Sequence, residues 1–197
     1  GRPFWGGTYF KPDQWKQLLE NIIELYAHQY QQLEAQADEI SEGVKRQNYL
    51  LAEESAESVG PVDFGSVFNT LHRSFDRVNG GLSGAPKFPM PVVLNFLLQY
   101  GMHTSDKEAI TLAEITLDKM SGGGIFDQAG GGFARYSTDS EWKVPHFEKM
   151  LYDNAQLIQS YALAFQATHK SDYMMVATQT IGFLNRDLRS VEGAYFS

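Results

Sequence analysis

Residues 121–155 have the sequence SGGGIFDQAGGGFARYSTDSEWKVPHFEKMLYDNA, and this stretch decides the predicted fold. It contains residues 131–133 (Gly-Gly-Phe), which pair small residues with a large apolar one. The same pattern occurs at residues 80–82 (Gly-Gly-Leu) and 193–195 (Gly-Ala-Tyr), and two helix signals separate each occurrence from the next. A helix pair followed by a glycine–aromatic loop is a repeating unit, and repeats of this length are typical of helical arrays and closed toroids.

Helical periodicity continues on both sides of this stretch. The apolar spacing predicts five helices, at residues 63–78, 92–100, 105–120, 145–165 and 171–188. Pro91 and Pro145 suit the first turn of a helix, and residues 105–108 (Ser-Asp-Lys-Glu) form a capping box. The apolar faces define the core, which is predicted to include Leu71, Phe75, Phe96, Leu157 and Phe183.

The start of the chain carries a different signal. Residues 3–10 (PFWGGTYF) are aromatic and glycine-rich, which is typical of a short strand or one arm of a hairpin. A helix with Asp13 as its N-cap is predicted to follow, and its apolar residues as far as Leu33 fit one face. Residues 36–60 are rich in Glu, Gln and Ser, which indicates a partly helical connector that ends at Pro61.

Composition excludes several classes of function. The 197 residues carry a net charge of -8, and no basic run exceeds Lys45-Arg46, so no nucleic-acid partner is predicted. No apolar stretch approaches the roughly 18 to 20 residues of a membrane-spanning helix, so no membrane partner is predicted. The absence of cysteine excludes a disulfide or a thiolate zinc site within the chain, and it fits a reducing, cytoplasmic location.

The chemistry of the chain is predicted to lie between Gly122 and Asn154. Glycines flank a single carboxylate, Asp127, and glycine lets the backbone approach a ligand closely. Burial among small neighbours would raise the pKa of Asp127 and make it an acid near neutral pH. Histidine exchanges protons in the same range, so Asp127 and His146 are predicted to form an ionisable pair, with His146 at the start of a helix.

The alternative interpretation of the same residues is structural. In that case Asp127 accepts backbone N–H groups in a turn, which would lower its pKa. The helix start would then carry only caps and surface ion pairs, such as Lys149 with Asp153. No metal or cofactor is predicted, because the sequence has no HExxH motif, acidic calcium loop, Walker loop or Rossmann glycine pattern.

Carboxylates, a histidine and aromatic platforms are the groups that sugar chemistry uses, so the predicted ligand is a small molecule of the sugar class. Asp127 with His146 would suit epimerisation, whereas Asp127 with Glu148 would be the carboxyl pair of an inverting hydrolase. Arg135 would anchor the ligand, and aromatic rings would stack on it. The predicted catalytic residues are Asp127, His146 and Glu148, and the predicted substrate-binding residues are Gln128, Phe133, Arg135, Tyr136, Trp142, Asp153 and Asn154.

Several stretches identify a family that the chain resembles. They are residues 84–89 (GAPKFP), 123–128 (GGIFDQ), 130–133 (GGGF), 135–137 (RYS) and, most specific, 144–155 (VPHFEKMLYDNA). Together they resemble the domain-of-unknown-function-255 family, which comprises thioredoxin-domain-containing proteins related to the spermatogenesis-associated thioredoxin-like protein. The resemblance spans almost the whole chain. Residues 81–84 (Gly-Leu-Ser-Gly) depart from the usual Gly-Gly-Phe-Gly, and Ala134 stands where a His is common.

The resemblance implies a thioredoxin-like domain followed by an (α/α)6 barrel akin to six-hairpin glycosidases and N-acylglucosamine 2-epimerases. Residues 1–35 would be the last strand and helix of the thioredoxin-like domain, residues 36–60 a linker, and residues 61–197 the first part of the barrel. The fold class is therefore mainly α with a partial toroid. The missing initiator Met and the glycine–aromatic end agree with a fragment of a longer protein.

Two functions are left open by this resemblance. In the first, the chain is part of an epimerase-like or glycosidase-like protein that binds or transforms a carbohydrate by acid–base chemistry. In the second, it is part of a thiol-redox or client-binding protein whose cysteines lie upstream, with the barrel as a scaffold. Fold analogy alone does not choose between them, because one fold hosts many functions.

Overall fold

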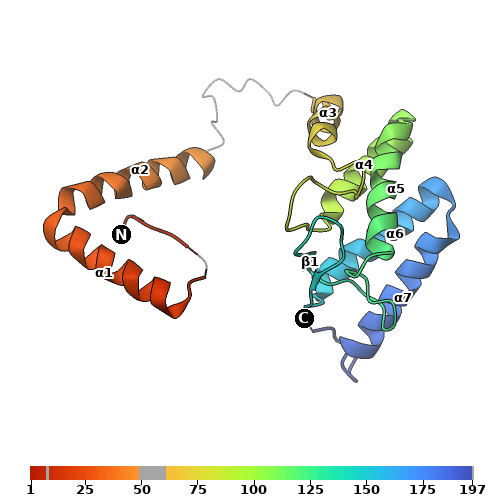
Figure 1. The fold of residues 1–197 in the computed structure, drawn as a ribbon. Helices are drawn as coiled ribbons and strands as arrows, with labels where there is room; N and C mark the ends of the chain where they lie inside the picture. Colours follow the sequence, from red (N-terminus) through yellow and green to blue (C-terminus); the bar gives the residue numbers. More distant parts are fainter. Residues whose placement is uncertain (8, 49–60, 197) are drawn as a thin grey trace. The chain divides into compact units, whose positions relative to one another are not determined.

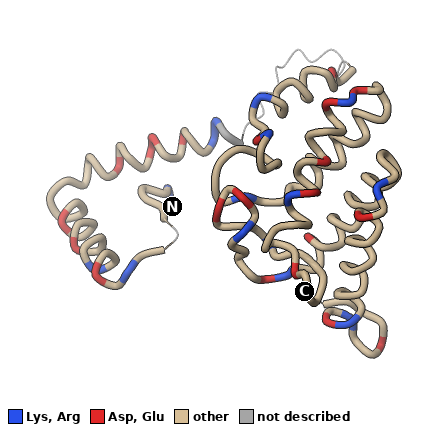
Figure 2. The backbone as a smooth tube through the Cα atoms, turned by 45° about the vertical axis from the view of Figure 1, so that its right-hand side comes forward, with Lys and Arg blue, Asp and Glu red and all other residues tan. Residues whose placement is uncertain are grey.

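The computed structural model describes residues 1–7, 9–48 and 61–196 and contains two compact units, Gly1–Pro61 and Val62–Ser197 (Figure 1). The chain is mainly helical, which confirms the predicted fold class. Acidic and basic residues are interspersed along both units (Figure 2). None of the described helices is long and apolar enough to cross a membrane.

The first unit consists of helices α1, Pro12–His28, and α2, Tyr30–Asn48, which pack against each other. Lys11 is the N-cap of α1, so Asp13 lies within the first turn instead of capping it, and that prediction is wrong. The chain leaves helical geometry at Gln29, which divides the predicted apolar face between two helices. The predicted connector therefore begins inside α2, and its residues 49–60 lie outside the described residues.

The predicted strand at residues 3–10 does not form in the described part of that segment, residues 3–7, 9 and 10. A strand needs a neighbour to pair its backbone N–H and C=O groups, and the described residues of this unit supply none. Instead, the rings of Trp5 and Phe10 pack together with centroids 5.2 Å apart, and Trp15 of α1 lies 5.8 Å from Phe10.

The second unit is built from helical hairpins (Figure 1). Helix α3 is Phe64–Ser74; α4, Pro91–Thr104, turns into α5, Lys107–Ser121; and α6, Leu151–Thr168, turns into α7, Ser171–Asp187. The turns within the hairpins are short, whereas the glycine–aromatic loops follow α3, α5 and α7. Because the helices of a hairpin run antiparallel, these long loops gather at the opposite end from the short turns. We call that end the mouth.

The core of the second unit lies along α4 and α6. These two helices pack against each other, and each also packs against its hairpin partner. Contact on several sides explains why residues 92–100 are apolar nearly all round. Leu97, Leu98, Leu157 and Tyr161 are fully buried in one continuous core. Of the predicted core residues, Phe75, Leu157 and Phe183 are buried. The other two, Leu71 and Phe96, are half-buried.

Two predicted helix starts carry aspartate caps. Asp63 accepts the backbone N–H groups of the second and third residues of α3, at 3.0 and 3.2 Å. Asp106 does the same for α5, at 2.9 and 3.2 Å. The predicted capping box is therefore wrong: the N-cap is Asp106, one residue later, because Ser105 adopts a left-handed backbone (φ 61°) that ends α4.

Two predicted helix boundaries are wrong. Helix α3 ends at Ser74, because Phe75 turns to extended backbone and pairs with Leu82. Residues 145–150 are not helical either: Pro145–His146 is strand β2, and α6 begins only at Leu151. A first-turn proline and a strand proline look alike in sequence, because both need only a fixed φ near -65°.

Strand β2 pairs antiparallel with β1, Tyr136–Ser137, so that Tyr136 lies opposite His146. Asp139 explains this pairing. Its carboxylate accepts backbone N–H groups from Glu141 at 2.6 Å and from Val144 at 2.6 Å, and so turns the chain back towards β1. His146 therefore lies on a strand at the mouth, not on a helix.

Hydrogen bonds confirm the glycine–aromatic repeat. In residues 76–81, the N–H of the aspartate donates to the carbonyl of the second glycine at 2.8 Å, and the first glycine N–H donates back at 2.8 Å. In residues 127–132 the same two bonds measure 3.0 and 2.8 Å. Both glycines of each pair have positive φ. In the third loop, the related bond runs from the Ser190 N–H to the Ala194 carbonyl at 2.7 Å.

Candidate functional site

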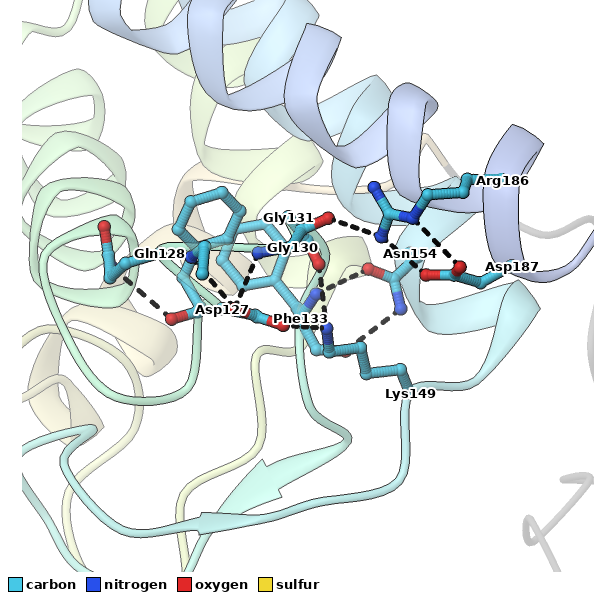
Figure 3. A network of polar contacts seen from close by, with 11 residues as sticks. Asp127, Gln128, Gly130, Gly131, Phe133, Lys149, Asn154, Arg186 and Asp187 are labelled. Atoms are coloured by element: carbon cyan, nitrogen blue, oxygen red, sulfur yellow. Dashed lines mark hydrogen bonds and ion pairs between the residues drawn. The ribbon is translucent and has the colours of Figure 1, made fainter.

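Asp127 lies at the centre of a polar network between the second glycine loop and the start of α6 (Figure 3). Its Oδ1 accepts the backbone N–H groups of Ala129 at 3.0 Å and Gly130 at 2.8 Å. Its Oδ2 accepts Lys149 Nζ at 2.6 Å, and the same ammonium donates to the Gly131 carbonyl at 2.8 Å. The carboxylate thus closes a turn and anchors a lysine.

The pKa of Asp127 moves in the direction opposite to the predicted one. The hydrogen bond from the Lys149 ammonium, followed by the N–H groups of Gly130 and Ala129, lowers the pKa of Asp127 to about 2. These donors stabilise the charged form more than partial burial disfavours it. The predicted rise is wrong, and the alternative, in which Asp127 caps a turn, describes the contacts of this carboxylate.

Two further side chains hold the same loop from neighbouring helices (Figure 3). Arg186 at the end of α7 donates to the Gly130 carbonyl at 2.9 Å. Asn154 in the first turn of α6 accepts the Phe133 N–H at 2.7 Å and donates to the Phe133 carbonyl at 3.0 Å. Because Asn154 is fully buried, its predicted contact with substrate is wrong, and it fixes the loop backbone instead.

Two aromatic residues predicted to stack on a ligand are also fully buried. Phe133 packs between Phe126 and Tyr161, with ring centroids 4.7 and 5.4 Å away. Trp142 donates its indole Nε1–H to the Asn79 carbonyl at 2.7 Å. The predicted stacking role is therefore wrong for both, because both rings are packed in the core, where the Trp142 N–H also has its hydrogen-bond acceptor.

Residues 145–149, which we call the strap, cross the mouth between β1 and α6. Pro145, Phe147 and Lys149 line an open cleft of about 350 Å³, together with Asp127 and Gln128. Neither His146 nor Glu148 of the strap lines this cleft, and neither does Arg135. The predicted convergence of Asp127, Arg135, His146 and Glu148 on one cavity is therefore wrong. Alternate residues of the strap line the cleft, and those between them do not.

Gln128 is exposed at the rim of this cleft, where its amide has a local role. Its Nε2 donates to the Ser121 carbonyl at 2.7 Å and so closes the turn that follows α5. The structure thus leaves Gln128 accessible, but on the Asp127 side of the strap.

Four rings form a continuous stack that ends on the strap. Phe88 and Tyr136 lie 4.8 Å apart, Tyr136 and His146 lie 4.7 Å apart, and His146 and Phe147 lie 5.2 Å apart, measured between centroids. The last two pairs are nearly parallel, at 9° each. Directly opposed residues of antiparallel strands have close Cβ atoms, so the Tyr136–His146 register creates the stack. Phe147, at its end, is 77% exposed.

Ionisable groups adjoin this ring stack. His146 Nδ1 lies 2.7 Å from Glu148 Oε2, and the Arg135 N–H donates to the Glu148 carbonyl at 2.8 Å. The Glu148 backbone N–H, the His146 ring and the Arg135 charge lower the pKa of Glu148. Arg135 Nη1 in turn donates to Tyr152 Oη at 2.5 Å, and its guanidinium lies 5.7 Å from the Tyr152 ring.

Asp153 is the carboxyl group with the opposite pKa shift. Burial raises the pKa of Asp153, and the nearby Arg135 charge only partly offsets this. Its Oδ2 is shielded from solvent and has no hydrogen-bond partner among the described residues. The predicted ion pair with Lys149 does not form, because Lys149 binds Asp127 instead.

The site residues that sequence reasoning brought together thus fall into two groups. Arg135, Tyr136, His146 and Glu148 adjoin one another at the ring stack, and Asp153 is linked to them through the charge of Arg135. Asp127 and Gln128 belong to the cleft. Sequence reasoning missed Phe88 and Tyr152. Phe88 lies in the GAPKFP motif and Tyr152 in the VPHFEKMLYDNA motif, so both residues belong to stretches that the family resemblance already singles out. Within the described residues, no three His, Cys, Asp or Glu side chains are grouped so that they could hold a metal ion.

Comparison with known proteins identifies homologues along the whole chain. Spermatogenesis-associated protein 20 of Homo sapiens is 38% identical over 217 residues, covering 100% of this chain and 26% of its own length. The protein of that name from Rattus norvegicus is 37% identical with the same coverage. An uncharacterized Caenorhabditis elegans protein is 36% identical over 81% of this chain and 23% of its own length. The chain spans about a quarter of these relatives. No protein-family model matches it.

Solved structures share the fold at low sequence identity. A sugar epimerase from a ruminal bacterium has a TM-score of 0.60 and 18% identity over 66% of this chain and 36% of its own. The cellobiose 2-epimerase of Spirochaeta thermophila has a TM-score of 0.56 and 18% identity, over 68% and 39%. A GH76 alpha-mannanase of Bacteroides thetaiotaomicron has a TM-score of 0.53 and 17% identity, over 64% and 37%. The second unit therefore has the fold of part of an α/α toroid.

Proposed function

We propose that this chain is part of a protein whose α/α toroid binds or transforms a carbohydrate at the mouth, on the strap that carries His146 and Glu148. The observation that carries the proposal is the position of His146, which lies in an exposed stack of four rings and within 2.7 Å of Glu148. Rings and a charge-bearing pair are thus presented together at the end of the toroid where the long loops gather.

The ring stack suits a ligand with an apolar face. Sugar rings have such faces, and aromatic side chains supply a large rigid contact area with few rotatable bonds. Phe147 at one end is 77% exposed and Phe88 at the other is 43% exposed. A sugar that packs on Phe147 would bring its hydroxyl groups next to the His146–Glu148 pair.

The ionisable groups suit acid–base chemistry. Histidine is the side chain that most often transfers protons in enzymes, and a carboxylate partner orients its ring. Glu148 provides that partner, while Arg135, hydrogen-bonded to Tyr152, provides an anchor for ligand oxygens. The pairing of Asp127 with Glu148 as hydrolase carboxyls receives no support, because Asp127 is bound to Lys149 and lines a different cleft.

The fold neighbours agree with a carbohydrate ligand, since they are two sugar epimerases and an alpha-mannanase. We further propose that the chain shares the family of spermatogenesis-associated protein 20, and that residues 1–35 are the end of a thioredoxin-like domain, residues 36–60 a linker and residues 61–197 the start of the barrel. A cytoplasmic location belongs to the same proposal.

Calorimetry on the natural-length protein that contains this chain tests the function. Cellobiose, mannose and N-acetylglucosamine are the probes, and at least one should bind. His146→Gln should weaken its binding by at least about tenfold, because the variant loses the proton-exchanging ring of the stack. His28→Gln, an exposed substitution in the first unit, should leave binding unchanged. A parent protein that binds none of the probes, or a His146 variant that binds as the parent does, contradicts the proposal.

A further inference from the structure

Two aspartates flank the strap along the chain, and they have opposite surroundings. Asp127 accepts three donors: two backbone N–H groups and the Lys149 ammonium. The Oδ2 atom of Asp153 is shielded from solvent and has no hydrogen-bond partner among the described residues. When two carboxyl groups have such different environments, the group without donors is the one suited to carry a proton.

The lack of a partner at Asp153 is itself informative. Buried polar atoms in folded proteins are nearly always hydrogen-bonded, so a shielded carboxyl oxygen without a donor favours the uncharged, protonated form of Asp153. The side chain is only half-buried, so a ligand would meet this carboxyl group through its other oxygen, Oδ1. Lys149, four residues earlier, would be the natural internal partner on a helix, but Asp127 binds it.

Arg135 links Asp153 to the proposed sugar site. Its charge acts on both Asp153 and Glu148, and its guanidinium is hydrogen-bonded to Tyr152, the residue before Asp153. A cation at this place stabilises the carboxylate that remains when Asp153 loses its proton. In the described residues, the titratable and charged groups around Asp153 are therefore Arg135, Tyr152 and, through Arg135, Glu148 with His146.

We propose that Asp153, and not Asp127, is the carboxyl group that exchanges a proton with the sugar at the mouth. This inference rests on the proposed function. The proton passes from the Asp153 carboxyl to a ligand oxygen and leaves a carboxylate beside Arg135. It returns by the reverse step, so no oxidant, reductant or further reactant is needed. Before transfer, the protonated carboxyl donates a hydrogen bond to the same ligand oxygen.

Isothermal titration calorimetry of the natural-length protein between pH 4 and pH 8 tests this, with the sugar that the parent binds. A protonated Asp153 that donates to the ligand makes parent affinity fall as pH rises, by up to about tenfold per pH unit above the pKa of Asp153. Asp153→Asn keeps a permanent N–H donor, so its affinity should stay high and lose this dependence. Asp153→Ala should bind weakly at every pH.

Asp127→Asn is the matched control. It should keep the pH dependence of the parent and lose thermal stability, whereas Asp153→Asn should melt at or above the parent temperature at pH 7. An Asp153→Asn variant that keeps the parent pH dependence overturns the inference but leaves the proposed function standing. An Asp153→Asn variant that melts well below the parent also overturns it, since the carboxylate then has a structural partner. A parent that binds no sugar removes both proposals.

Discussion

Asp76 and Asp127 hold equivalent positions in successive glycine loops. Each carboxylate accepts the backbone N–H groups of the residues two and three positions further along, and each accepts a lysine ammonium at 2.6 Å. Lys87 in the first loop and Lys149 in the second also donate to the glycine carbonyl four positions after the aspartate, at 2.6 and 2.8 Å. The repeat therefore preserves an interaction, although the two lysines come from different places in the sequence.

The first prediction compares these two aspartates. The Lys87 side chain is 1% exposed, so Asp76→Ala would leave a buried ammonium with only the Gly80 carbonyl and the Trp142 ring as described partners, at a cost of about 3–5 kcal/mol. The Lys149 side chain is 22% exposed and can turn to water, so Asp127→Ala should cost only about 1–2 kcal/mol. Denaturant titration of both variants measures the difference. Equal losses in the free energy of unfolding would show that the burial of Lys87 does not make the Asp76–Lys87 pair more important than the Asp127–Lys149 pair.

The second prediction concerns acid stability. Burial alone would raise the pKa of Asp76, but the N–H of Asn79, the Lys87 ammonium and the N–H of Val78 outweigh it and lower the pKa to about 2. The pKa of Asp127 is also about 2. Because both folded values lie below the ordinary 3.8, the stabilisation is present above pH 3.8 and disappears as pH falls towards 2.

Thermal melts of the parent and of Asp76→Asn between pH 2 and pH 7 provide the check. The parent should melt higher than Asp76→Asn at pH 7, and the gap should shrink as pH falls from about 4 to about 2. A gap that stays constant down to pH 2 would show that the carboxylate charge contributes nothing.

The third prediction concerns the glycine loops. Gly131 has φ +74°, and a Cβ there would lie 2.5 Å from the Gln179 backbone oxygen of α7. Gly131→Ala should therefore destabilise the protein by at least about 1–3 kcal/mol. Gly182→Ala is the control, because Gly182 lies inside α7 with open space around it and should gain about 0.5–1 kcal/mol. Denaturant titration that finds the same sign for both variants would contradict this account.

The fourth prediction separates two residues that the sequence predicts to be buried. Leu157 of α6 is fully buried, so Leu157→Ala should cost about 2–5 kcal/mol through lost burial and a cavity. Leu71 of α3 is half-buried, and its replacement should cost less, about 1–2 kcal/mol, because less apolar surface returns to water. The midpoint of a denaturant titration ranks the two, and the reverse order would show that α3 packs more tightly than α6.

Sequence reasoning predicted the helices well because their signals are local. Apolar spacing located α3 to α7, and Pro91 begins α4 as predicted. The strap was missed for a physical reason: Pro145 suits both a first helical turn and a strand, and the Asp139 turn that precedes it decides between them. Such a turn leaves no periodic signal in the sequence.

The candidate site was predictable only in part. The residues that adjoin the ring stack were named from the sequence, but their partners depend on strand register and on competition between ions. Tyr136 meets His146 because the strands pair in that register. Lys149 could pair with Asp153 along a helix, yet Asp127 binds it, and this ion pair helps to lower the pKa of Asp127 where the sequence predicts a rise.

Adjacent residues of the strap are fastened independently. Lys149 is held by Asp127 and the Gly131 carbonyl, while the Glu148 carbonyl accepts the Arg135 N–H. The backbone under the His146–Glu148 pair is therefore preorganised by folding, so its conformational entropy is not lost again when a ligand arrives. A small polar molecule could then bind with useful affinity through few contacts. Replacing Lys149 would slow association and so weaken binding, although no group that touches the molecule is lost.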